Sequence, residues 1–392
     1  MTCPPSSGSG SVRKPLVRPN LTGGIVMAGN YAPPGPFAPT VLVPGGVDAS
    51  NKALASAELY NIEHGFWTPI EGFYLPRSQH TATLLPSTQP TGFSKVIIAG
   101  GMITGSAYQE TIVELYDEVY THWYAVGRLL TPRLIITATV LRNWRVLVMG
   151  GSDTCELYDP AQMVWEPTGS LHGTRSQHTA TLLKTSEVLV IGGVGSTGFL
   201  NTAELYDEAR QVWTPTTSLQ TSAFGHTATL LPDGKVLVAG GMDASGQGRK
   251  DSFLYDRATQ TWTDTTPLNV GRTNHTATPM SNGWVMVVGG YGRLGEVLNS
   301  AEIYDPGAKE WRQTSPLSVP RIGHTTTLLP IGDMLVAGGS NSCEIYDISA
   351  NVWSLTGFLN TARGYHTATL LEAGGNPYFG VVVSFAGITT KA

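Results

Sequence analysis

A repeat of about 50 residues constrains this chain more than any other feature. Seven Gly-Gly pairs each end a short apolar segment, at 45–46, 100–101, 150–151, 192–193, 240–241, 289–290 and 338–339. A tyrosine follows each pair, and a tryptophan stands seven residues after each of these tyrosines, at Trp67, Trp123, Trp165, Trp213, Trp262, Trp311 and Trp353. A spacing that holds seven times means that one structural unit recurs along the chain.

One unit contains four short β-forming segments separated by turn residues. In the unit that begins at His226, these segments read HTATLL, KVLVAGG, SFLYD and the stretch around Trp262. Four strands in 42–55 residues are typical of a β-propeller blade,. A single blade cannot cover both of its faces, whereas seven blades packed radially can. The sequence therefore predicts an all-β, seven-bladed propeller with four antiparallel strands per blade.

The Gly-Gly pair, the tyrosine and the tryptophan at these spacings resemble the kelch motif, from residue 41 to about residue 371. The strand sequences HTATLL and VLVAGG are also similar to the propeller domain of galactose-oxidase-like proteins. The kelch resemblance implies a propeller that binds other proteins. The second resemblance implies a copper site with tyrosine and histidine ligands, partly from a further C-terminal domain, and no residue of this chain can be matched to those ligands.

Two charged positions recur together and predict a semi-buried ion pair in each blade. Six units carry arginine ten residues after the tryptophan, and six carry glutamate in the third segment, at Glu58, Glu114, Glu156, Glu204, Glu302 and Glu344. The one unit with Ala223 in place of arginine also has Phe253 in place of glutamate. Removing one partner of a buried pair costs about 3–5 kcal/mol, whereas replacing both can be neutral, so joint absence is expected.

The same register predicts how the ring closes. Arg363 and His366 begin a first strand near the C-terminus, while the blade that starts near Val41 has none of its own. Joining these two segments pairs Arg363 with Glu58 and makes residues 23–392 one propeller domain, preceded by a flexible tail at 1–22. The strand-like segments 25–28 and 380–387 leave an eighth, partial blade as the alternative.

Composition excludes several classes of protein. The net charge is −5, only 14% of residues are charged, and no run of lysine or arginine provides the basic stripe of a nucleic-acid binder,. No apolar stretch is long enough to span a membrane. Three cysteines do not make a disulfide framework, and residues 1–22 lack the apolar core of a signal peptide, although a signal removed before residue 1 stays open. We therefore expect a monomer, with a cytoplasmic location favoured.

The residues that could carry chemistry have simpler structural explanations. Six units place a histidine at one position, so these side chains would form a ring, and we expect a backbone partner for each imidazole rather than a metal. Cys155 and Cys343 occupy a slot that is alanine, valine or serine elsewhere, which indicates small buried residues. No serine-hydrolase, zinc-protease or Cys-x-x-Cys motif occurs. We predict no enzyme activity, no catalytic residue, no metal site and no cofactor.

The segments after the Gly-Gly pairs vary most and are expected on one face, together with the connections between blades. Binding residues usually lie on such loops. The candidates are Asp48, Lys52, Tyr108, Glu110, Phe199, Arg249, Lys250, Asp251, Tyr291, Arg293 and Glu296. Two units have only three residues here, which would leave notches for a peptide or a glycan. The sequence favours a protein-interaction scaffold, with a carbohydrate-binding or oxidase-like module and a structural segment of a longer protein as alternatives.

Overall fold

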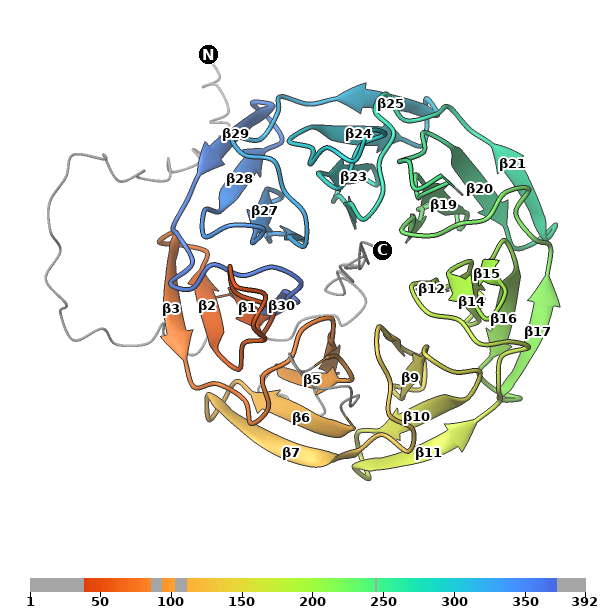
Figure 1. The fold of residues 1–392 in the computed structure, drawn as a ribbon, viewed down its shortest axis with the longest axis horizontal. Helices are drawn as coiled ribbons and strands as arrows, with labels where there is room; N and C mark the ends of the chain where they lie inside the picture. Colours follow the sequence, from red (N-terminus) through yellow and green to blue (C-terminus); the bar gives the residue numbers. More distant parts are fainter. Residues whose placement is uncertain (1–38, 86–93, 103–110, 244, 372–392) are drawn as a thin grey trace, which may run out of the picture. The chain divides into compact units, whose positions relative to one another are not determined.

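The computed structural model describes residues 39–85, 94–102, 111–243 and 245–371. These residues form seven four-stranded antiparallel sheets that follow one another around a ring, as the blades of a propeller do (Figure 1). The predicted seven-bladed, all-β fold is confirmed. The segments 25–28 and 380–387, on which the eighth-blade alternative rested, lie outside the described residues, and so does the predicted tail 1–22.

Each blade runs from an innermost strand near the axis of the ring to an outermost strand at its rim (Figure 1). In that order, blade 1 consists of β30 (Thr369–Leu371), β1 (Thr40–Pro44), β2 (Ala57–Asn61) and β3 (Phe66–Ile70). Blade 2 consists of β4 (Thr81–Leu85), β5 (Lys95–Ala99), β6 (Ile112–Asp117) and β7 (His122–Arg128). Blade 3 consists of β8 (Thr137–Val140), β9 (Val146–Met149), β10 (Cys155–Asp159) and β11 (Val164–Thr168).

The remaining four blades repeat this arrangement. Blade 4 consists of β12 (Thr179–Leu182), β13 (Val188–Ile191), β16 (Ala203–Asp207) and β17 (Val212–Thr216), and it carries the separate hairpin of β14 (Val194–Gly195) and β15 (Gly198–Phe199). Blade 5 consists of β18 (Thr227–Leu230), β19 (Val236–Ala239), β20 (Ser252–Asp256) and β21 (Thr261–Asp264). Blade 6 consists of β22 (Thr276–Pro279), β23 (Val285–Val288), β24 (Ala301–Asp305) and β25 (Glu310–Gln313). Blade 7 consists of β26 (Thr325–Leu328), β27 (Met334–Ala337), β28 (Glu344–Asp347) and β29 (Val352–Leu355).

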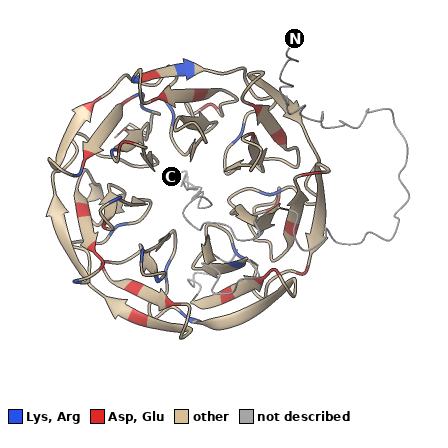
Figure 2. Cartoon of the chain, turned by 180° about the vertical axis from the view of Figure 1, so that it is seen from behind, with Lys and Arg blue, Asp and Glu red and all other residues tan. Residues whose placement is uncertain are grey.

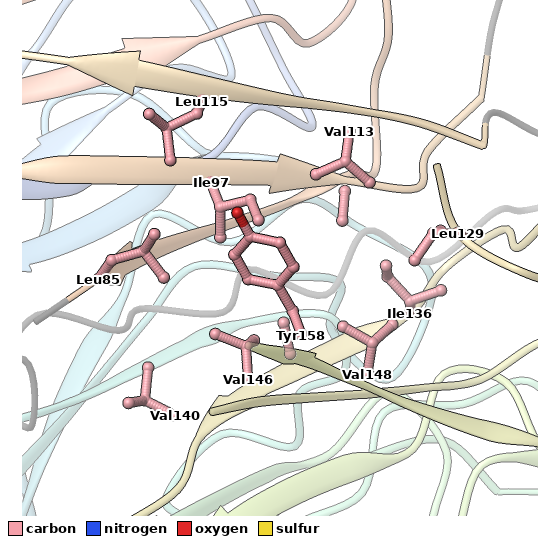
Figure 3. Packing of buried hydrophobic residues seen from close by; sticks show 12 residues of the cluster. Leu85, Ile97, Val113, Leu115, Leu129, Ile136, Val140, Val146, Val148 and Tyr158 are labelled. Atoms are coloured by element: carbon pink, nitrogen blue, oxygen red, sulfur yellow. The ribbon is translucent and has the colours of Figure 1, made fainter. Parts of the chain in front are cut away.

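The core of the protein lies between the blades. In six blades the second strand, such as β19 or β23, buries every residue, and in blade 2 it exposes only Lys95, because a neighbouring blade covers each face of the strand,. Figure 3 shows one junction, in which Tyr158 of blade 3 lies among aliphatic side chains of blades 2 and 3. In every blade the tyrosine of the repeat packs on the tryptophan seven residues after it, with ring centroids 4.9–5.1 Å apart. These aromatic residues are therefore packing residues.

The ring closes as predicted from the register. The C-terminal strand β30 pairs antiparallel with β1, so that Thr369 lies opposite Leu42 and Leu371 lies opposite Thr40. Arg363 then reaches Glu58, with Nη2 and Oε1 2.8 Å apart. The first blade is thus assembled from both ends of the described chain.

All six predicted arginine–glutamate pairs form, and both side chains of each pair are buried. Their N–O distances are 2.6–2.9 Å, in the pairs Arg77–Glu114, Arg133–Glu156, Arg175–Glu204, Arg272–Glu302, Arg321–Glu344 and Arg363–Glu58. Each arginine also donates to the carbonyl of the first glycine of its Gly-Gly pair, as Arg272 Nη1 does to Gly289 at 2.9 Å. Figure 2 shows the acidic positions recurring from blade to blade. Each arginine therefore ties the connection that enters its blade to the Gly-Gly pair at the start of that blade's loop.

The six histidines form inter-blade hydrogen bonds through Nε2, to threonine side chains that the sequence analysis did not name. In each case Nε2 lies 2.8–3.1 Å from a threonine hydroxyl of the preceding blade, in the pairs His80–Thr367, His178–Thr137, His226–Thr179, His275–Thr227, His324–Thr276 and His366–Thr325. Blade 3 has Ile136 in place of the histidine. Thr81 of blade 2, which faces this position, therefore has no imidazole to bond and donates to the Ala99 carbonyl. A Cβ at Gly45 would lie 2.7 Å from His80 Cε1, so the glycine makes room for the imidazole.

Two further features agree with the sequence analysis. Cys155 and Cys343 are buried free thiols in different blades. No helix long and apolar enough to cross a membrane occurs in the residues that were placed.

Candidate functional site

The loops after the Gly-Gly pairs share one face with the connections between blades. Backbone hydrogen bonds tie the two together: Leu219 donates to the Asn201 carbonyl at 2.9 Å, and Leu317 donates to Asn299 at 2.8 Å. This face, which we call the loop face, therefore carries those predicted candidates that lie among the described residues.

Loop length divides the blades into two kinds. Blades 3 and 7 have only three residues here, 152–154 and 340–342, and their hydroxyl groups join the buried pair, as when Arg133 donates to Thr154 Oγ1 at 2.8 Å. Blades 1, 4, 5 and 6 instead form small hairpins, at 47–53, 194–199, 242–248 and 291–297. Blades 3 and 7 stand nearly opposite each other in the ring (Figure 1), so the hairpins fall into separate groups.

The hairpin of blade 1 owes its shape to an aspartate. Asp48 Oδ1 accepts hydrogen bonds from the backbone amides of Ser50 and Lys52, at 2.8 and 3.0 Å. A carboxylate that caps its own turn is a common device in tight loops. The structure thus gives the candidate Asp48 a turn-forming role and leaves the candidate Lys52 exposed.

Blades 4, 5 and 6 are neighbours, and side-chain contacts join their hairpins into one surface, which we call the hairpin ridge. Phe199 of blade 4 stacks on Phe224, with centroids 4.8 Å apart and an interplanar angle of 9°. Arg249 of blade 5 donates to the Ser222 carbonyl at 3.1 Å, two residues before Phe224. Arg293 of blade 6 donates to Gln247 at 3.0 Å. These contacts connect three loops that are far apart in sequence.

Apolar side chains project from the ridge. Leu294, at the tip of the blade 6 hairpin, is 88% exposed, and Phe199 is 39% exposed. The backbone beneath Leu294 is held, because its amide donates to Glu296 Oε2 at 2.8 Å. The candidate Glu296 thus shapes the hairpin that presents Leu294.

Blade 5 has no buried arginine–glutamate pair, and its loop carries a surface pair of Arg249 and Asp251. They form an ion pair with each other beside Ala223, where the other blades have arginine. The side chain of Arg249 is 17% exposed and that of Asp251 43%, so the pair lies at the surface, whereas the other pairs are buried. Two predicted partner-binding residues are therefore brought together, and they are engaged with each other.

Tyr291 lies beside a residue that the sequence analysis did not single out. Tyr365, at the entry to blade 1, donates its backbone amide to Gly323 at 2.7 Å and has a φ of 57°. Burial, with Tyr291 beside it, raises the pKa of the Tyr365 phenol to about 12. The Tyr365 phenol is therefore protonated at neutral pH and can donate a hydrogen bond.

The other candidates are accounted for more simply. Lys250 is exposed on the blade 5 loop. Tyr108 and Glu110 lie outside the described residues, so their place on the loop face stays a prediction. Sequence reasoning missed Phe224, Leu294 and Tyr365. Phe224 could have been found because its counterparts in the other units are serine, threonine, leucine, isoleucine or glycine.

The buried thiols are poor nucleophiles. Burial raises the pKa of Cys155 to about 12 and that of Cys343 to about 11, although a nearby arginine opposes the shift in each case. A thiolate is the reactive form, so neither cysteine is activated. Within the ranges placed by the structure, no group of three or more histidine, cysteine, aspartate or glutamate side chains could hold a metal ion.

Comparison with known proteins agrees with this architecture. Among solved structures, the chain is similar to one described as "Novel fungal alcohol oxidase with catalytic diversity among the AA5 family, in complex with copper". The identity is 16% and the TM-score 0.59, over 74% of this chain and 67% of that one. Likeness at this identity shows the fold alone, so copper chemistry is not carried over, and the absence of enzyme activity stays a prediction. No curated protein sequence matches the chain.

The family comparison is more specific. Residues 178–376, over half of the chain, match the family described as "KLHDC2/KLHL20/DRC7 Kelch-repeats domain". The matched region covers blades 4 to 7 and the strand that closes blade 1. This chain therefore belongs to the KLHDC2/KLHL20/DRC7 Kelch-repeat family.

Proposed function

We propose that the chain is a protein-interaction scaffold that binds a polypeptide partner through the hairpin ridge. The observation that carries the proposal is the exposed Leu294 on a hairpin whose backbone is already fixed. Interface hot spots are typically a few anchor side chains on rigid supports, because little conformational entropy is then lost on binding. Phe199, stacked on Phe224, supplies a second such anchor on the same ridge.

The partner that suits this surface has an apolar pocket for a leucine side chain and a polar rim. Lys250 and Arg293 are exposed near the anchors. Charged residues at a rim mainly affect the association rate and its salt dependence. We therefore expect apolar contacts to set the dissociation rate and these cations to set the association rate.

The test uses a pair of matched substitutions in the full chain. Leu294→Asp places a charge on the ridge, and Ile331→Asp places one on a turn of the opposite face, where the isoleucine is 53% exposed. Proteins cross-linked in cells to a photoreactive residue at position 250, which is exposed on the blade 5 loop, are identified for each variant. We expect the partner to be lost in Leu294→Asp and kept in Ile331→Asp.

A loop graft gives a second reading. Blades 3 and 7 show that three residues suffice between the Gly-Gly pair and the cysteine that precedes the glutamate of the third strand. Replacing 291–299 with Ser-Asn, while keeping Ser300, copies the loop of blade 7 onto blade 6. A graft that keeps the thermal midpoint of the parent and the same cross-linked partner would contradict the proposal.

A further inference from the structure

The outermost strand of each blade has one edge that pairs with no other strand among the described residues, at the rim of the ring (Figure 1). Such an edge offers backbone donors and acceptors to a further strand, and proteins protect it with proline, with charged side chains or by keeping the strand short. Six of the seven outermost strands are four or five residues long, whereas β7 of blade 2 has seven. Blade 2 therefore has the longest edge at the rim.

The backbone groups of an outermost strand point outward at every second residue. In blade 5 the amide of Thr265, three residues after Trp262, donates to the Ser252 carbonyl of the third strand at 3.1 Å. The residue two places after the tryptophan therefore directs its N–H and C=O away from the sheet. Blades 1, 3 and 4 have proline at this position, which has no N–H to offer, at Pro69, Pro167 and Pro215,.

Blade 2 has alanine where these blades have proline. Ala125 lies opposite Glu114 of β6, in the same register as the prolines opposite their glutamates. The N–H and C=O of Ala125 therefore face outward, and so do those of Trp123 two residues earlier. The register with β6 shifts only beyond Ala125, so residues 122–125 form a regular edge with an available donor at each outward position.

The other blades without proline are protected in different ways. Blades 5, 6 and 7 have outermost strands of only four residues. In addition, β21 ends in Asp264, and β25 contains Glu310 and Arg312, whose charges oppose pairing with a further strand,. Among the outermost strands that the structure describes, only β7 is both long and free of proline and of charge between its two end residues, His122 and Arg128.

Exposed tyrosines single out the same blade. Tyr74 on the connection into blade 2, Tyr120 on the turn before β7 and Tyr124 within β7 are 73%, 68% and 40% exposed. Elsewhere in the described ranges, every tyrosine is buried or half-buried. Tyrosine is enriched in protein interfaces, where its ring buries apolar area and its hydroxyl keeps a polar partner. The rim of blade 2 thus combines an unprotected edge with side chains typical of an interface.

The two ends of β7 carry opposite charges. At its start, His122 Nδ1 lies 2.5 Å from Glu71 Oε2, and both side chains are about half exposed. At its end, Arg128 is exposed. In an antiparallel pair the start of one strand lies beside the end of the other, so two copies of β7 bring each Arg128 toward the Glu71 of the other copy. This charge pattern favours a second copy of the chain as the occupant of the edge.

We propose that the chain forms a two-fold symmetric dimer in which the β7 strands of two copies pair antiparallel, instead of the monomer expected from composition. The axis passes beside Tyr124, so Trp123 of each copy lies opposite Ala125 of the other and exchanges two backbone hydrogen bonds with it. The two Tyr124 side chains meet at the axis, in the kind of pair whose side chains are closest. Such a contact closes on itself and leaves the hairpin ridge of blades 4 to 6 free.

Sedimentation of the full chain over a concentration series tests the dimer. The parent should approach twice the 41.7 kDa mass of one copy. Ala125→Pro copies the residue that blades 1, 3 and 4 accept at this register, and it should stay a monomer at every concentration. Gln313→Pro makes the same change on the edge of blade 6 and should dimerise like the parent. A parent that stays monomeric, or an Ala125→Pro variant that dimerises equally well, would overturn the proposal.

Cysteine cross-linking tests the register and does not depend on how a proline is tolerated. A Cys3→Ser background leaves only the two buried native thiols. Tyr124→Cys places two thiols at the axis, where Cα atoms about 4.5 Å apart allow a disulfide. Tyr120→Cys is the control, because this position is more exposed but lies four residues from the axis. We expect an oxidised dimer from Tyr124→Cys alone, and equal cross-linking of both variants, or of neither, would contradict the pairing.

Discussion

Acid should unfold this protein through its ring of buried histidines. Burial, reinforced at most positions by a neighbouring arginine, lowers the pKa of His80, His178 and His324 to about 3. The pKa of His226 falls only to about 4, and its blade is the one with Ala223 in place of arginine. The other two, His275 and His366, also have a pKa well below the usual value.

The direction and size of the effect follow from linkage. A histidine in the unfolded chain takes up a proton near pH 6.5, while the folded site stays neutral, so stability is complete above pH 6.5 and is lost as the pH falls toward the folded pKa. Between pH 7 and pH 5 each buried histidine lowers the free energy of unfolding by roughly 1.9 kcal/mol, and the six together lower it by roughly 11 kcal/mol. Because folded domains are stable by about 5–15 kcal/mol, we expect unfolding near pH 5.

Urea unfolding at pH 7, 6, 5.5 and 5 measures this loss. His178→Ile copies the side chain of Ile136 in blade 3 and should reduce the pH dependence by one proton, or about 1.4 kcal/mol per pH unit. Thr137→Val, which removes the partner of His178 but no titrating group, should lower stability at every pH and leave the pH dependence unchanged. A free energy of unfolding that stays constant from pH 7 to pH 5 would refute the reasoning.

Two further predictions concern the buried pair and the glycine beside it. Glu302→Ala should lower the free energy of unfolding by about 3–5 kcal/mol, because it leaves the buried Arg272 without its partner,. Adding Arg272→Ala should recover part of that loss. Additive losses in a double-mutant cycle, measured by urea unfolding, would show that the two residues are not coupled. Gly240→Ala should cost about 1–3 kcal/mol more than Gly246→Ala. Both glycines have positive φ, but only a Cβ at Gly240 meets other atoms, the Arg272 carbonyl at 2.5 Å and His275 Cε1 at 2.8 Å; equal losses on thermal unfolding would contradict the packing argument.

The buried pairs show which kind of contact a repeat reveals. The shared loss of arginine and glutamate at Ala223 and Phe253 predicts the pairing, because a single buried charge is too costly to keep,. The same logic assigns the closing pair of Arg363 and Glu58, which are 305 residues apart. Contacts made between constant positions leave no such signal. The six histidine–threonine bonds join residues that hardly vary, so sequence reasoning did not identify threonine as the partner of Nε2.

The hairpin ridge was less accessible to sequence reasoning. The candidates Phe199, Arg249 and Arg293 were found because their segments vary between units. That they contact Phe224, Ser222 and Gln247 depends on which loops lie side by side. Loops of unequal length have no common register, so spacing along the chain does not determine those contacts.

The sequence alone determined the all-β architecture, the number of blades, the buried ion pairs and the way the ring closes, because a regular repeat converts spacing into position. Only the tertiary structure decided which residues meet across the blade boundaries and on the loop face. Those contacts depend on how neighbouring blades pack and on the path of each loop, and neither is set by the hydrophobic pattern of a single unit. The surface on which we place function is therefore the part of the molecule that the repeat leaves free to vary.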